Sequence, residues 1–156
     1  MVKKKLGKWV LGAVGMLCLV FWTAMPALAA VPQRPANKYV LDEAGVLSSA
    51  TEREIIKENE ELIEECVAEF VIVAVDFLGG KDIEDYANDL FNTWGIGSSQ
   101  RNNGILLVLA IGEENYYATT GYGLEDYFDG AKFQELFDDY LEEDFAAGRY
   151  DEGVEA

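Results

Sequence analysis

Two uninterrupted apolar runs, residues 70–75 and 105–111, constrain the fold of this chain more than any other feature. Short runs of β-branched and aliphatic residues without polar alternation are typical of strands that are buried on both faces. Between the runs, apolar residues recur at helical spacing: Ile83, Tyr86, Ala87, Leu90, Phe91 and Trp94. A strand, an amphipathic helix and a second strand in this order predict a parallel pair joined by a crossover helix.

Further elements extend this pattern on both sides. A short edge strand is expected at 39–41, and a helix is expected to begin at Ser49, which has Glu52 at the capping-box spacing. A tight turn after the second apolar run predicts a hairpin with a strand at 116–120, and a last long helix is expected at 131–145. The sequence therefore predicts an α/β fold, a three-layer α/β/α sandwich with a small mixed, mostly parallel sheet.

Residues 1–29 have the pattern of a secretory signal peptide. Four lysines within the first eight residues precede an uncharged run that extends to Gln33, and small residues after Pro26 form a cleavage site that ends at Ala29. The alternative is an uncleaved anchor, because the uncharged run is long enough to cross a bilayer. Both alternatives predict an exported, extracytoplasmic protein that is membrane-tethered or secreted. Residues 30–38 are expected to form an extended lead-in and residues 39–156 a single domain.

The composition is strongly acidic, with a net charge of −17, and histidine is absent. Removal of the signal peptide takes four of the 12 basic residues and none of the 29 acidic ones, which leaves −21. Nucleic acid and anionic lipid are disfavoured as partners because both are negatively charged. Without histidine, Ser-His-Asp and Cys-His catalysis are excluded. Only Cys66 remains in the mature chain, so no internal disulfide is expected.

Several short segments, in this order and at this spacing, resemble the TPM domain family. They are residues 40–48 (VLDEAGVLS), 83–87 (IEDYA), 90–97 (LFNTWGIG), 102–108 (NNGILLV), 121–125 (GYGLE) and 145–150 (FAAGRY). Together they extend the resemblance over residues 39–156, nearly all of the mature chain. The chain departs from the family pattern at 113–117, where relatives usually carry an arginine, and at Asp144, where relatives often carry a proline. The first departure weakens any expectation of phosphate binding at that place.

The resemblance implies a general setting for the protein. Family members are typically exported or lumenal, and many bacterial members continue into a transmembrane helix and a Gly/Ser-rich tail. Chloroplast members are linked to photosystem II repair, one of them was proposed to be an acid phosphatase, and an animal member modulates a receptor channel. Divalent cations have been associated with the fold. In this chain the last residues, 153–156, lie inside an apparent helix, which indicates a domain truncated at its C-terminus.

Four residues are candidate ligands for a divalent cation: Asp42, Asn103, Glu125 and Asp126. Ligands of open α/β sheets gather at the carboxyl ends of the strands, where we expect these side chains to converge. Carboxylate and amide oxygens suit Ca²⁺ or Mg²⁺. The alternative is structural: Asp42 forms an Asx-turn, and Glu125 caps the segment after Gly123.

Other polar features carry less chemistry. The Gly121-Tyr122-Gly123 segment lacks the third glycine of a dinucleotide fingerprint and is expected as a sharp turn that uses the backbone freedom of glycine. Asp76 follows a buried strand, but no second aspartate stands two positions on, and Arg101 is the single cation in a plausible site loop. Any phosphate ester hydrolysis would therefore depend on a metal ion.

Tyrosines cluster around the predicted hairpin at Tyr116, Tyr117, Tyr122 and Tyr127. If they are exposed, they suit a protein contact, where tyrosine is enriched; the alternative is a half-buried sheet face. The leading hypothesis is a non-enzymatic, extracytoplasmic module that binds a membrane-protein partner and is steadied by a divalent cation. The alternative is a weak metal-dependent phosphomonoesterase of the acid phosphatase kind.

Overall fold

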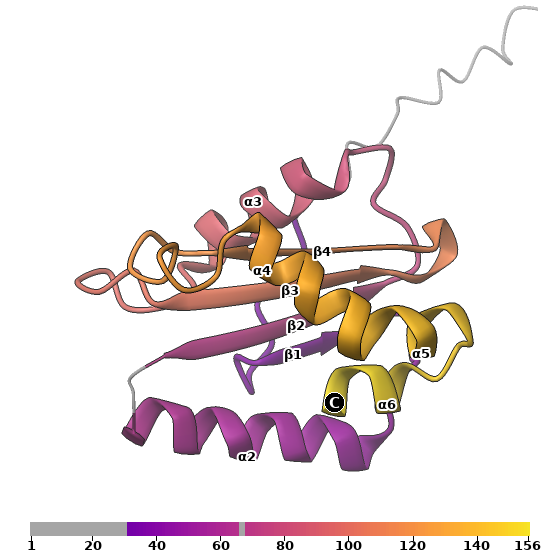
Figure 1. Ribbon diagram of the computed structural model, residues 1–156, viewed down its shortest axis with the longest axis horizontal. Coiled ribbons are helices and arrows are strands. Elements are labelled where there is room, and N and C mark those ends of the chain that lie inside the picture. Colours follow the sequence, from indigo (N-terminus) through magenta and orange to yellow (C-terminus); the bar gives the residue numbers. More distant parts are fainter. Residues whose placement is uncertain (1–30, 66–67) are drawn as a thin grey trace, which may run out of the picture.

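The computed structural model describes residues 31–65 and 68–156, so the signal segment and Cys66 lie outside the described residues. Four strands form one sheet in the order β1 (Val40–Asp42), β2 (Glu69–Val75), β3 (Gly104–Ala110) and β4 (Asn115–Thr120) (Figure 1). The first three strands are parallel, and β4 is antiparallel to β3. The predicted mixed, mostly parallel sheet is confirmed.

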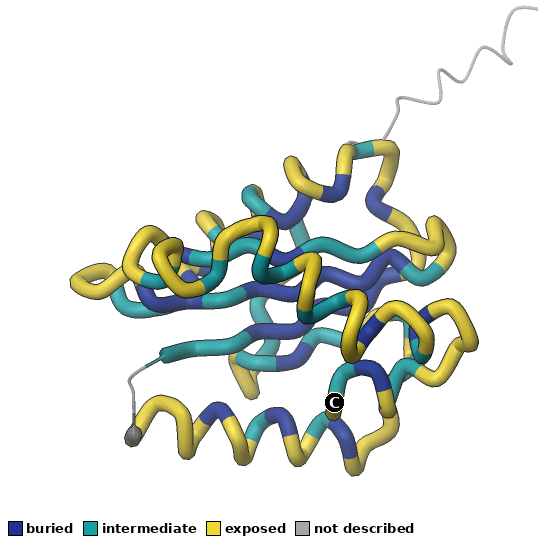
Figure 2. The backbone as a smooth tube through the Cα atoms, in the orientation of Figure 1, coloured by how far each residue is buried: buried dark blue, intermediate teal, exposed yellow. Residues whose placement is uncertain are grey.

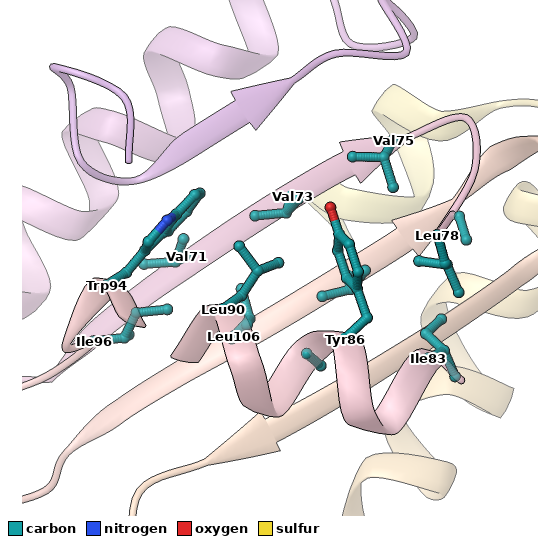
Figure 3. Close-up of a cluster of buried hydrophobic side chains, with 13 residues drawn as sticks. Val71, Val73, Val75, Leu78, Ile83, Tyr86, Leu90, Trp94, Ile96 and Leu106 are labelled. Carbon is teal, nitrogen blue, oxygen red and sulfur yellow. The ribbon is translucent and has the colours of Figure 1, made fainter. Parts of the chain in front are cut away.

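Helix α3 (Ile83–Trp94) covers one face of the sheet. It begins after Asp82, whose side chain accepts a hydrogen bond from the Glu84 N–H at 2.9 Å, and it ends at the left-handed Gly95. Its apolar stripe packs on the residues of β2 and β3 that point to this face, such as Val71 and Leu106 (Figure 3). Alternate strand residues point to opposite faces, so the uninterrupted apolar runs supply two cores.

The other face is covered by α2 (Ser49–Glu65), α4 (Gly130–Leu136), α5 (Glu142–Ala146) and α6 (Tyr150–Glu155) (Figure 1). The second core joins Ile72, Ala74, Leu107 and Leu109 of the sheet to side chains of these helices. Helices on both faces of one sheet make the three-layer α/β/α sandwich that the sequence predicts.

The predicted helix at 131–145 is a continuous helical stretch with a π-helical segment, Phe137–Leu141, between α4 and α5. Its core-facing residues, Phe133, Phe137, Leu141 and Phe145, are each four apart. A step of four residues overshoots one α-helical turn by about 40°, so three steps would rotate the last of them about 120° away from the first. The wider π turn removes most of this drift. All four aromatic and aliphatic side chains therefore face the sheet.

The capping residue of α2 is Ser48, one position before the predicted Ser49. The Ser48 Oγ accepts a hydrogen bond from the Thr51 N–H at 3.2 Å, which is the capping geometry. The Ser48 N–H in turn donates to Asp151 Oδ1 at 2.7 Å, so α6 is tied to the start of α2. The buried Asn59 ties the other half of α2 to the sheet, because its Oδ1 accepts from the Phe70 N–H at 2.8 Å.

The lead-in before β1 is packed against the domain from Val31 onward. The indole N–H of Trp94 donates to the Pro32 carbonyl at 2.8 Å, and Arg34 donates to the Trp94 carbonyl at 3.0 Å. Arg34 also forms an ion pair with Glu69 at the start of β2. These contacts hold the lead-in against the C-terminal end of α3. Within the described residues, none of the helices has the length and apolar character needed to cross a membrane.

Candidate functional site

Asp42 lies at the carboxyl end of β1, where it organises the chain that leads into α2. Its Oδ1 accepts from the Gly45 N–H and its Oδ2 from the Leu47 N–H, both at 2.8 Å. Both oxygens therefore serve the turn, as in the structural alternative for this residue. At the neighbouring strand end, the backbone carbonyl of Asp76 accepts from the Gly112 N–H at 2.8 Å.

The other three candidate ligands lie at the other end of the strands, near the amino ends of the parallel strands. Asn103 immediately precedes β3, and its Oδ1 accepts from the Ser98 N–H at 2.9 Å. Glu125 and Asp126 follow β4, whose last residue, Thr120, pairs with Ile105 at the start of β3. Both of these carboxylates are exposed.

The expectation that the four candidate ligands converge is therefore wrong. Asp42 ends a parallel strand, next to Ala74 near the end of β2. Because β4 runs antiparallel, the loop after it returns to the amino ends of the parallel strands, and Asn103 precedes a strand instead of following one. Across residues 31–65 and 68–156, no group of three or more acidic or cysteine side chains is placed to hold a metal ion. The same geometry separates Asp76 from Arg101, the two residues considered for phosphate chemistry.

The Gly121-Tyr122-Gly123 segment is needed for close packing and not for an unusual backbone conformation. Neither glycine has a positive φ. A Cβ on Gly121 would lie 2.7 Å from the Asn102 carbonyl carbon, and a Cβ on Gly123 would lie 3.0 Å from the Asn102 oxygen and closer still to the Arg101 oxygen. The Gly123 N–H donates to the Asn102 carbonyl at 2.9 Å. The prediction of a turn that uses glycine's backbone freedom is corrected: the two loops approach too closely for any side chain.

A groove of about 650 Å³ lies beside β4, and we call it the edge groove. One wall is β4 from Tyr116 to Thr120, and the other is built by residues of the segment 125–137, which contains α4. β4 is an edge strand, because the sheet order ends with it. The Gly121-Tyr122-Gly123 segment lies just before the second wall in the sequence.

The register of β4 determines which backbone groups point into the groove. The Gly121 N–H donates to the Gly104 carbonyl at 2.9 Å, which continues the Ile105–Thr120 register by one residue. Hydrogen-bonded pairs alternate in an antiparallel ladder, so residues 115, 117 and 119 bond to β3, and the peptide groups of Tyr116, Ala118 and Thr120 point outward. The Asn115 side chain accepts from the Tyr116 N–H at 2.9 Å. Among the described residues, the N–H groups of Ala118 and Thr120 have no protein acceptor.

Carboxylates surround the edge groove. Glu125, Asp126 and Asp129 line it, and none of the lysines and arginines in the described part of the chain does. Burial raises the pKa of the Tyr116 hydroxyl, and the nearby carboxylates Glu142 and Asp138 raise it further. On the opposite face of β4, burial raises the pKa of the Tyr117 hydroxyl, and the negative charges of Glu84 and Asp82 near the start of α3 raise it further. The strand edge thus lies in a field of negative charge on both faces.

A second, apolar groove of about 300 Å³ lies on the other side of α4, between α4, α6 and the sheet. It shares Ala118, Phe128, Phe133 and Phe137 with the edge groove. No residue of α4 is fully buried, and the tube in Figure 2 shows this helix as intermediate or exposed throughout. The helix thus separates the two grooves, and its Phe133 packs against the second core together with Phe137, which directly follows the helix.

Two of the four clustered tyrosines lie on the sheet faces, and the other two are exposed. Tyr116 and Tyr117 are half-buried on opposite faces of β4, as the sheet-face alternative requires, whereas Tyr122 and Tyr127 are 82% and 72% exposed. Sequence reasoning did not find the edge groove. The available signal was the uncharged, proline-free β4 sequence at the end of the predicted strand order, because natural edge strands usually carry a charge or a proline.

The fold and the grooves define a small α/β domain with an open strand edge. The TPM domain family model matches residues 40–156, and the chain belongs to this family. The N-terminal domain of a protein from P. gingivalis, solved by NMR, is 34% identical with a TM-score of 0.68, over 74% of this chain and 73% of that one.

Two further NMR structures share the fold at lower identity. The N-terminal domain of cg2496 from Corynebacterium glutamicum is 16% identical with a TM-score of 0.59, over 81% of this chain and 78% of that one. The BA42 protein from Bizionia argentinensis is 17% identical with a TM-score of 0.59, over 69% and 73%. No curated protein matches the chain.

Proposed function

We propose that this chain is an extracytoplasmic TPM-type module that binds a membrane-protein partner at the edge groove. The observation that carries the proposal is the groove itself: a concave surface beside an open strand, lined by aromatic side chains and carboxylates. Aromatic residues are enriched where proteins bind one another, and convergent polar groups give such sites their specificity. The exposed Tyr122, in the glycine segment after β4, adds an aromatic surface close in sequence to the groove wall.

Divalent cations enter this proposal as counter-ions. A net charge of −17 makes the surface repel itself and any acidic partner. Ca²⁺ or Mg²⁺ would bind the exposed carboxylates and reduce this repulsion. Asp42 lies at the carboxyl ends of the parallel strands, away from the carboxylates of the groove, so it has no part in the cation's effect on the groove.

Site-specific photo-crosslinking in cells that make the protein tests the proposal. A photoreactive residue replaces Asp126 in the groove wall and, as the matched control, Glu60 on the exposed face of α2. We expect a discrete adduct in the membrane fraction from position 126 only, at a yield that changes when Ca²⁺ is chelated. Equal adducts from both positions, or none from either, would contradict the proposal.

A second experiment tests the enzymatic alternative: the purified, unaltered protein is assayed with a generic phosphomonoester and Mg²⁺. Turnover that disappears in the Asp42→Ala, Glu125→Ala double variant would replace the binding proposal with the phosphomonoesterase alternative. We expect no turnover, because Asp42 lies at the carboxyl ends of the parallel strands and Glu125 lies near their amino ends. A hydrolytic centre needs its groups within hydrogen-bond reach of one substrate.

A further inference from the structure

We infer that the edge groove takes an extended, basic segment of the partner, which pairs with β4 and adds a fifth strand to the sheet. This inference rests on the proposed function and specifies its chemistry. β-strand addition needs an exposed sheet edge for affinity and pockets beside it for specificity. The edge groove offers both, together with a charge that selects the partner.

The backbone of β4 supplies the first requirement. The outward peptide groups of Ala118 and Thr120 stand two residues apart, which is the spacing at which an added strand forms its hydrogen bonds. The strand has six residues and therefore offers a length of about 20 Å. Its sequence, Asn-Tyr-Tyr-Ala-Thr-Thr, contains no proline and no charge that would block pairing.

The far wall supplies the second requirement. The rings of Phe128 and Phe133 stack with centroids 5.8 Å apart, and Phe133 and Phe137 stack at 6.2 Å. This row of rings runs beside β4 and lines the groove. Side chains of an added strand alternate between its two faces, so every second residue would lie against the rings. An apolar residue at every second position fits this wall.

Charge decides the nature of the partner. Glu125, Asp126 and Asp129 line the groove, and further carboxylates flank both faces of β4. An extended segment with lysine or arginine at its remaining positions would complement this field, which favours association and excludes acidic partners. A second copy of the chain would bring the same carboxylates together, so edge-to-edge dimerisation is disfavoured.

Peptide titration tests the inference on the full chain. The probe is a fluorescent, end-capped peptide that alternates lysine with valine, and its controls carry glutamate for lysine or N-methyl groups on alternate backbone nitrogens. We expect the lysine peptide to bind at least ten-fold more tightly than either control. Its binding should protect the Ala118 and Thr120 amide protons from hydrogen exchange. An N-methylated peptide that binds equally well, or an unchanged exchange rate at these amides, would overturn strand addition.

Two variants separate the backbone from the charge contribution. Ala118 is itself buried, but its N–H points away from β3, so Ala118→Pro removes an outward N–H without removing a bond to β3, and we expect at least ten-fold weaker binding. Glu125→Gln with Asp126→Asn should weaken binding several-fold and reduce its salt dependence. Glu60→Gln with Glu61→Gln on α2 removes the same charge elsewhere and should leave the affinity unchanged. Equal weakening by both double variants would overturn the site.

The outcomes also separate this inference from the function on which it rests. If position 126 cross-links to a membrane protein but Ala118→Pro leaves that adduct unchanged, the module binds its partner without strand addition. If Ala118→Pro does not fold, the N-methylated peptide decides the same question on the unaltered protein. If the chain dimerises and the peptide does not dissociate the dimer, the groove binds a second copy, and the inference fails.

Discussion

Replacing Gly123 with alanine places a methyl group where the backbone of the neighbouring loop already lies. The new Cβ would be 3.0 Å from the Asn102 oxygen, 3.1 Å from the Arg101 carbonyl carbon and closer still to the Arg101 oxygen. All three atoms belong to the main chain, so no side-chain rotation relieves the overlap. One of the two loops must move, and the hydrogen bond from the Gly123 N–H to the Asn102 carbonyl weakens with it.

The expected loss of stability follows from these contacts. Overpacking in a well-packed site costs about 1–3 kcal/mol, and rigid backbone partners favour the upper end of that range. For a domain of this size, 3 kcal/mol corresponds to a fall in Tm of about 10 °C. We expect this fall in a thermal unfolding experiment followed by circular dichroism.

Gly130→Ala is the matched control. Apart from its chain neighbours and the backbone of its own helix, nothing in the described residues lies within 4 Å of a Cβ built at this position. Its φ is not positive, and it is the first residue of α4. Alanine there should leave Tm unchanged or raise it slightly, because alanine favours helix and restricts the unfolded chain. Equal Tm values for the Gly123→Ala variant and the unaltered protein would refute the close approach of the two loops. The position of the groove wall that follows Gly123 would then be in doubt.

Two further predictions concern the ties of α2. Asn59→Ala leaves the Phe70 N–H without its acceptor and the Ile55 carbonyl without the Asn59 amide, so we expect a loss of about 1–3 kcal/mol in urea unfolding; an unchanged midpoint would contradict the buried tie. The Ser48 N–H lowers the pKa of the Asp151 carboxyl. The stability that this gives is present above the ordinary aspartate pKa and is lost as pH falls through the lowered value. Asp151→Asn should therefore be less stable at pH 7, by at most about 1 kcal/mol because this carboxylate is partly exposed, and the difference should vanish in acid. A difference that persists at low pH would refute the ionic contribution.

Most of the layers follow from local patterns in the sequence. The apolar run at 70–75 and all but the last residue of the run at 105–111 lie in buried strands, and the stripe from Ile83 to Trp94 is the helix between them, with a cap at Asp82 and a stop at Gly95. These elements depend on periodicity and on residues within a few positions of one another. The cap of α2 is Ser48 and not the predicted Ser49, and this position also involves a distant residue. The Asp151 carboxylate that accepts from the Ser48 N–H is 103 residues away.

The site was only partly predictable. The hairpin expected at 105–120 already implies that β4 runs opposite to the parallel strands, so Glu125, which follows β4, lies at the other end of the strands from Asp42, the last residue of β1. The expected convergence of the four ligands did not take this strand direction into account. The need for glycine at Gly121 and Gly123 is not visible in the sequence, since the atoms that exclude a side chain belong to Arg101 and Asn102.

The sequence by itself thus determined the layers and the acidic character, because hydrophobic periodicity and charge are properties of the residues in order. Only the tertiary structure decided which strand became the open edge, which carboxylates came to flank it, and where the aromatic wall was placed. The order of the strands and the packing of the segment 125–137 beside β4 are set by contacts between segments that are distant in the sequence, and these contacts create the edge groove.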